Sequence, residues 1–192
     1  YLYGRNPSYS LAKNAFTDVI DSLQEHLSQQ NHLTWFAKTA HALAYRQRAY
    51  LKKRQYALNA AIRDYKRAAK INRALDFNFE EAMIRNDLGD TQVLAGYFDE
   101  ARLNLQDAFD LRQQMKNGAR LALSYSSFAR YFTATGAVSQ ARISALKGIN
   151  LSSRVGRNTA LARISFAEAT RRYAQELGTP ASRREELFAE AL

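Results

Sequence analysis

The stretch "DLGDTQVLAGYFDEARLNLQDAFDLRQQM", residues 87–115, decides the fold. It contains two amphipathic patterns with the period of a helix, separated by Gly96, a residue that commonly ends helices. The spacing predicts helices over 80–95 and 97–116, the second closed by residues 116–118. A helical hairpin of this kind buries its apolar face by stacking on copies of itself, so copies are expected elsewhere in the chain.

Copies recur at steps of 40 residues, in columns that keep side-chain size. Three columns hold small residues in four successive copies: Ala42, Ala82, Ala122 and Ala162; Ala49, Gly89, Ala129 and Ala169; Ala61, Ala101, Ala141 and Ala181. A further small column is Ala68, Ala108 and Gly148, and the large columns include Leu58, Phe98 and Val138. Small residues let two helices approach closely while large ones fill the grooves, so the columns predict stacked helix pairs.

The period divides the chain into repeats that we expect to form one continuous domain. Residues 1–31 are expected to hold a leading helix, the second helix of a preceding repeat. The repeats then run over 32–76, 77–117, 118–156 and 157–192, the last one truncated. Because the chain starts at Tyr1 and stops within the helical pattern "REELFAEAL", we expect a piece of a longer protein with other domains.

Composition favours a folded, water-soluble domain. The 192 residues are 46% hydrophobic and 24% charged, close to the average for globular domains. The absence of cysteine excludes disulfides, thiolate metal sites and a cysteine nucleophile. No apolar run approaches the ~20 residues of a membrane-spanning helix, and no leader pattern opens the chain. We therefore expect a cytoplasmic protein that does not enter a membrane.

The second repeat resembles the tetratricopeptide repeat (TPR) family at Leu88-Gly89, Gly96-Tyr97, Glu100-Ala101 and Ala108. The usual TPR has 34 residues, and a period of 40 is similar to the repeats of kinesin light chains and of the sensor arms of bacterial STAND-class ATPases. This resemblance implies an all-α, right-handed solenoid of antiparallel helix pairs, about nine helices in this chain. It also implies that the first helices line an inner groove that binds a protein or peptide.

The groove positions of the family carry over to four residues on each first helix. The polar and aromatic members are Arg46, Tyr50 and Lys53; Asn86 and Asp90; Ser126, Arg130 and Thr133; and Arg163, Phe166 and Thr170, accompanied by Leu43, Met83, Val93, Leu123 and Tyr173. We expect Asn86 to bond a peptide backbone, because an amide both donates and accepts. Arg46, Arg130 and Arg163 are expected to meet carboxylates or phosphates. The alternative reading is a polar surface that only keeps the face soluble.

The net charge of +10 lies in bands along the sequence. Residues 45–73 hold ten Lys and Arg against Asp64 alone, and residues 74–110 hold nine Asp and Glu against two Arg. Within the first band, Arg63, Lys66, Arg67 and Lys70 recur at helical spacing and predict a basic stripe on the outer side of one helix. Such a stripe suits nucleic acid, but Tyr45 and Tyr65 fall in interior columns, which weakens that reading.

No residue pattern indicates an enzyme, a metal site or a cofactor. The histidines, His26, His32 and His41, fall around one predicted turn and are expected on the surface. We therefore expect a protein- or peptide-binding sensor or scaffold segment of a larger bacterial regulatory or signalling protein. The alternative is a basic helical-repeat scaffold that contacts nucleic acid or a nucleoprotein complex. Self-association through Leu187, Phe188 and Leu192 is a third reading.

Overall fold

A computed structural model describes residues 7–30, 34–156, 160–176 and 178–191. Within these ranges the chain forms nine α-helices and no strand. The helices are α1 (Pro7–Gln30), α2 (Trp35–Arg54), α3 (Leu58–Ala74), α4 (Asn78–Ala95), α5 (Phe98–Gln114), α6 (Gly118–Ala134), α7 (Val138–Arg154), α8 (Ala160–Glu176) and α9 (Ala181–Ala191). The helices predicted over 80–95 and 97–116 are confirmed as α4 and α5.

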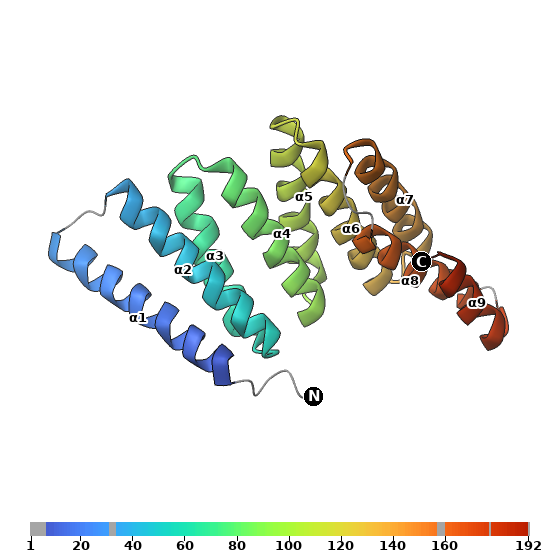
Figure 1. Ribbon diagram of the computed structural model, residues 1–192, viewed down its shortest axis with the longest axis horizontal. Helices are drawn as coiled ribbons and strands as arrows, with labels where there is room; N and C mark the ends of the chain where they lie inside the picture. Colours follow the sequence, from blue (N-terminus) through green and yellow to red (C-terminus); the bar gives the residue numbers. More distant parts are fainter. Residues whose placement is uncertain (1–6, 31–33, 157–159, 177, 192) are drawn as a thin grey trace. The chain divides into compact units, whose positions relative to one another are not determined.

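The helices gather in two compact units, Tyr1–Gly96 and Tyr97–Leu192. In the first unit, α1 to α4 follow one another as antiparallel neighbours, each packed on the next (Figure 1). In the second unit, α5 to α9 do the same, and α6 also packs directly on α8. No helix of the described residues is both long and apolar enough to cross a membrane. The repeat boundaries stay a prediction.

The size columns of the sequence are packing positions. Ala42, Ala82, Ala122 and Ala162 are buried, as are Ala49, Gly89, Ala129 and Ala169. The column that starts at Ala61 is buried as far as Ala141, but its last member, Ala181, is exposed at the start of α9. The forty-residue period is therefore set by helix contacts in three copies, and it fades in the fourth.

The turns between helices share one backbone conformation. A residue with positive φ stands at Tyr56, Asp76, Gly96, Lys116, Gly136 and Gly156, which places one every 20 residues. After α2, for example, the N–H of Ala57 bonds to the carbonyl of Lys52, which closes the Schellman motif around a left-handed residue. Glycine marks only half of these turns, so the sequence shows the half-period less clearly than the structure does.

A buried ion cluster joins α2 and α3 in the first unit. The guanidinium of Arg48 donates to both oxygens of Asp64 at 2.7 and 2.9 Å, and Lys52 donates to Oδ2 of Asp64 at 2.7 Å. Arg48 also reaches the hydroxyl of Thr17 on α1 at 3.3 Å. Burial alone would raise the pKa of Asp64, but the bonds from Arg48 and Lys52 outweigh it and lower that pKa.

His41 lies in the interior, so the prediction of a surface residue is wrong for this histidine. It is 8% exposed, and its ring stacks at 4.7 Å on Tyr45, one turn further along α2. Burial, together with the charges of Arg67 and Arg48, lowers the pKa of His41. His26 is exposed on α1 as predicted, and His32 lies outside the described residues.

Small residues bring the helices of the second unit close together. A Cβ atom added to Gly148 of α7 would meet the carbonyl oxygen of Ala122 at 3.3 Å and the Cβ atoms of Ala162 and Tyr125 at 3.4 Å. Gly148 therefore lies where α7 touches both α6 and α8. The small column predicted from the sequence sets this close approach.

Candidate functional site

A hollow of about 360 Å³ opens between α2 and α4 in the first unit. Its walls come from both helices and from the turn before α4. The lining residues are Phe36, Thr39, Ala40, Leu43, Arg46, Asn72, Phe77, Glu80 and Ile84. The volume lies at the lower end of the range of about 300–1,000 Å³ typical of binding pockets.

Apolar side chains form the rim and floor of the hollow. Phe36 is 78% exposed and Leu43 is 51% exposed at its rim, while Ile84 is buried at its floor. Tyr50, 47% exposed, continues the line one further heptad along α2. Phe36, Leu43 and Tyr50 thus lie seven residues apart on one face of the helix. Exposed apolar side chains in line beside a hollow favour the binding of another apolar surface.

One cation stands among carboxylates on the polar side of the hollow. The guanidinium of Arg46 lies 3.6 Å from Oε2 of Glu80 and 3.5 Å from Oδ2 of Asp87. Burial raises the pKa of Asp87, and Arg46 and Lys53 oppose that shift. Arg46 therefore already has two acidic partners.

The comparisons with known proteins concern the fold. The structure resembles the crystal structure of BtubC (BKLC) from P. vanneervenii, with a TM-score of 0.67, 17% sequence identity, and coverage of 92% of this chain and 74% of that chain. It also resembles nearly identical TPR-like repeats of kinesin light chain type from Podosopora anserina, with a TM-score of 0.63, 14% identity, and coverage of 95% and 92%.

The fold is a TPR-like helical repeat. The resemblance predicted from residues 87–115 and the all-α solenoid of antiparallel helix pairs are confirmed. At these identities the likeness concerns the fold alone. No family model matches the sequence, and no curated protein matches it.

In the first unit of the TPR-like fold, the predicted groove residues fall into two groups. Leu43 and Arg46 line the hollow, and Tyr50 and Lys53 continue along α2 beyond it. Asn86 is only 7% exposed, and its amide donates to Oδ2 of Asp90 on the same helix at 3.3 Å. Its bond to a peptide backbone stays a prediction.

In the second unit, packing covers most of the predicted groove residues. Ser126 and Thr133 are buried and donate to carbonyls of their own helix, those of Ala122 and Ala129. Arg130 donates to Ser127 at 3.0 Å. The face of α6 therefore presents few of its polar groups outward.

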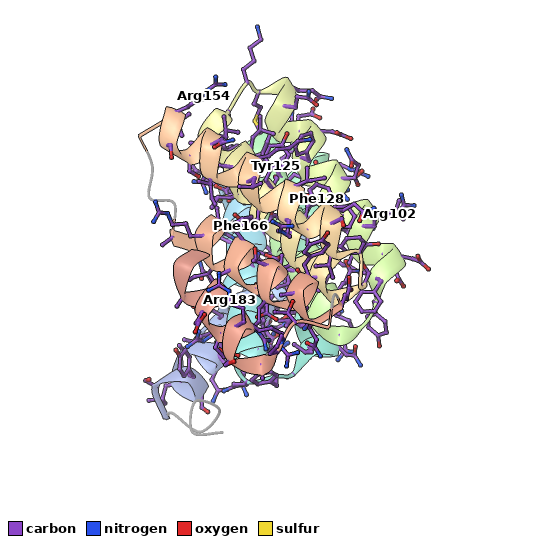
Figure 2. All side chains as sticks on the ribbon, turned by 90° about the vertical axis from the view of Figure 1, so that its right-hand side faces the viewer. Arg102, Tyr125, Phe128, Arg154, Phe166 and Arg183 are labelled. Atoms are coloured by element: carbon purple, nitrogen blue, oxygen red, sulfur yellow. The ribbon has the colours of Figure 1, made fainter. Side chains whose placement is uncertain are left out.

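On α8, the predicted residues turn partly toward α7. The guanidinium of Arg142 on α7 lies 5.9 Å from the ring centre of Phe166, labelled in Figure 2, and 4.7 Å from that of Tyr173. Thr170 is half-buried between these rings in the sequence, and Arg163 is exposed. Of this set, the structure thus brings Phe166 and Tyr173 together around one cation.

The predicted basic stripe lies on the exposed face of α3. Arg63, Lys66, Arg67 and Lys70 are all exposed, while Tyr65 is buried between them in the sequence. Arg67 turns back to Tyr45, with its guanidinium 5.4 Å from the ring centre. The stripe therefore presents cations without an aromatic side chain among them.

Sequence reasoning missed the apolar members of the hollow. Phe36 lies seven residues before Leu43, so extending the predicted groove face by one heptad would have found it. Phe77 and Ile84 carry no comparable signal, because they reach the hollow only through the packing of α4 on α3. The side chains of Leu187, Phe188 and Leu192, expected to promote self-association, lie outside the described residues.

Proposed function

We propose that this chain is a protein-interaction scaffold that binds a peptide segment of its partner in the hollow between α2 and α4. The observation that carries the proposal is the exposure of Phe36 and Leu43 beside an apolar floor. Covering these side chains would remove apolar surface from water, at about 25 cal/mol per Å². Binding of this kind requires no catalytic group, so we propose a scaffold and not an enzyme.

The finer proposal concerns the setting of the scaffold. The chain serves as a sensor or scaffold segment of a larger bacterial regulatory or signalling protein in the cytoplasm, with the effector in another domain. Its support is the resemblance of the forty-residue period to the sensor arms of STAND-class ATPases. Purification of the parent protein with and without this segment, followed by assay of its effector, would test this.

A displayed library of random 12-residue peptides tests the binding proposal. Selection on the wild-type chain should yield peptides that lose binding to the Phe36→Ser variant. The matched control is Tyr56→Ser, because Tyr56 is similarly exposed, at 81%, but does not line the hollow. Peptides that bind all three proteins equally, or a selection that enriches nothing, would contradict the proposal.

The second candidate function is contact with nucleic acid through the stripe on α3. Within the described residues Arg63, Lys66 and Lys70 form no ion pair, so their charge stays available to phosphates. Without interleaved aromatic rings, this contact would follow the phosphate backbone and not the bases.

A salt titration separates the two candidates. Binding to random double-stranded DNA should weaken steeply with salt, by close to one unit of logarithmic slope for each phosphate contact. Replacement of Arg63, Lys66, Arg67 and Lys70 together by Gln should remove that slope. Equal slopes for the wild-type and the quadruple variant would reject this second function.

A further inference from the structure

The hollow between α2 and α4 contains more negative than positive charge. Arg46, with 24% of its side chain exposed, is shared between Glu80 and Asp87, which are 27% and 38% exposed. At 3.6 and 3.5 Å, both contacts are too long for the forked hydrogen bonds that an arginine forms with a single carboxylate. A ligand carboxylate at Arg46 would therefore have to compete with two carboxylates already present.

The buried groups under the hollow respond to the same excess of negative charge. Burial raises the pKa of Tyr65, and the charge of Asp87 raises it further than the charge of Arg46 lowers it. Asp87 itself has a raised pKa, first because of burial, and Asp90 adds to the rise. A carboxylate whose charge is penalised in this way gains from a further cation placed beside it.

The apolar part of the hollow requires the opposite chemistry. Phe36 and Leu43 at the rim stand above Ile84, with Ala40 and Phe77 on the sides. None of these side chains can bond a polar group, and burying an unpaired one here would be unfavourable. The part of a ligand that fills the hollow is therefore apolar.

We propose that the hollow takes an apolar side chain from a protein segment that carries a lysine or arginine close to it, and that it discriminates against acidic segments. The apolar side chain contacts Phe36 and Leu43, and the basic one approaches Glu80 and Asp87. This inference rests on the proposed function, and it assigns a different role to Arg46 from the one expected from the sequence. Arg46 holds two carboxylates in place and does not receive one from the ligand.

The experiment uses the same random 12-residue library on the full chain, with removal of every peptide that also binds Phe36→Ser. Because this variant keeps the net charge, the step removes acidic peptides attracted by the charge of +10. The retained peptides should be enriched in Leu, Phe or Met and in Lys or Arg. Glu80→Gln combined with Asp87→Asn should weaken their binding about fivefold, as expected for loss of a partly exposed charge pair. Arg46→Gln should leave binding unchanged or strengthen it.

Each outcome is decisive once circular dichroism shows that the variants are folded. Phe36-dependent peptides that are rich in Asp or Glu, or that lose binding to Arg46→Gln, overturn this inference and leave the proposed function standing. Equal enrichment of acidic and basic residues also overturns it. A selection without Phe36-dependent peptides removes both the proposed function and this inference. Raising the salt concentration provides an independent measurement, since it should weaken the binding of the basic peptides.

Discussion

The helices α2 and α6 hold matching places in the two units, eighty residues apart, yet their faces differ. On α2, Leu43 and Tyr50 are exposed beside a hollow. On α6, Ser126 and Thr133, at equivalent positions, are buried and bonded to their own helix. The reason is the size of the side chains: Ala122, Ser126 and Ala129 let α6 pack directly on α8. Larger residues between α2 and α4 leave space.

The same difference extends to what stabilises each unit. The first unit is held by a buried ion cluster around Asp64, and the second by close contacts of small residues such as Gly148. One repeat geometry therefore allows either an open, charged interior or a tight, apolar one. The open version retains a surface for a ligand, while the tight version retains only a support.

The largest expected effect is the loss of the ion cluster. Asp64→Ala leaves Arg48 and Lys52 without their common partner, which should cost about 3–5 kcal/mol in the free energy of unfolding. Urea unfolding measures the loss, and amide hydrogen exchange should speed up in α2 and α3 but not in α6 and α7. The double variant Arg48→Met with Asp64→Leu is the control and should regain part of the loss. A cost of Asp64→Ala below about 1 kcal/mol would contradict this account.

The counterpart in the second unit is overpacking at Gly148. Gly148→Val adds atoms between α6, α7 and α8 and should cost about 1–3 kcal/mol, measured by urea unfolding. Asn150→Val is the matched control, because it places the same β-branched residue at an exposed site of α7. If both variants lose the same free energy, helix propensity and not close packing explains the effect.

A pH dependence should be specific to the first unit. Because the folded chain lowers the pKa of His41, the unfolded chain binds that proton more tightly. Stability is therefore lost as the pH falls below the ordinary histidine pKa of about 6.5, with a slope of at most ~1.4 kcal/mol per pH unit, until the folded pKa is passed. Urea unfolding between pH 7.5 and 5 measures it, and His41→Phe should flatten the curve. An unchanged slope in that variant would assign the effect to other groups.

The smallest effect should be the same in both units, because the turns are alike. Tyr56→Gly in the first unit and Lys116→Gly in the second replace residues whose φ is positive, 59° and 51°. Glycine adopts this conformation freely, so each variant should gain about 0.5–1 kcal/mol in thermal unfolding. Gly96→Ala should lose a similar amount. A loss in either glycine variant would show that the side chain at the turn stabilises more than its backbone strain costs.

The helices and their spacing could be predicted from the sequence, because they depend on the sizes of residues at a fixed period. Ala61 and Ala101 lie in the interior for the same reason that they recur. The kinesin light chain type of repeat, predicted from the forty-residue period, also appears among the structural matches. The end of the chain was less predictable, since Ala181 continues its column in sequence but not in burial.

The charged interior could not be predicted in the same way. Asp64 was visible as the one acid in a basic band, but its ion cluster depends on how far α2 and α3 turn toward each other. His41 carried no signal of burial, because histidine suits both surface and interior. Arg46 was expected to be available to an anion, whereas in three dimensions it meets Glu80 from the next first helix. Pairing across helices decides these side chains, and a one-dimensional pattern does not contain it.

The left-handed residue that stands at every twentieth position constrains how this chain can change in length. A single inserted residue within a helix rotates all later side chains by about 100° and moves each buried alanine away from its neighbour. An insertion of one half-period restores the rotation but reverses the direction of every later helix. Only a duplication or deletion of a whole hairpin preserves both, so we expect evolution and engineering alike to lengthen such a chain in whole hairpins.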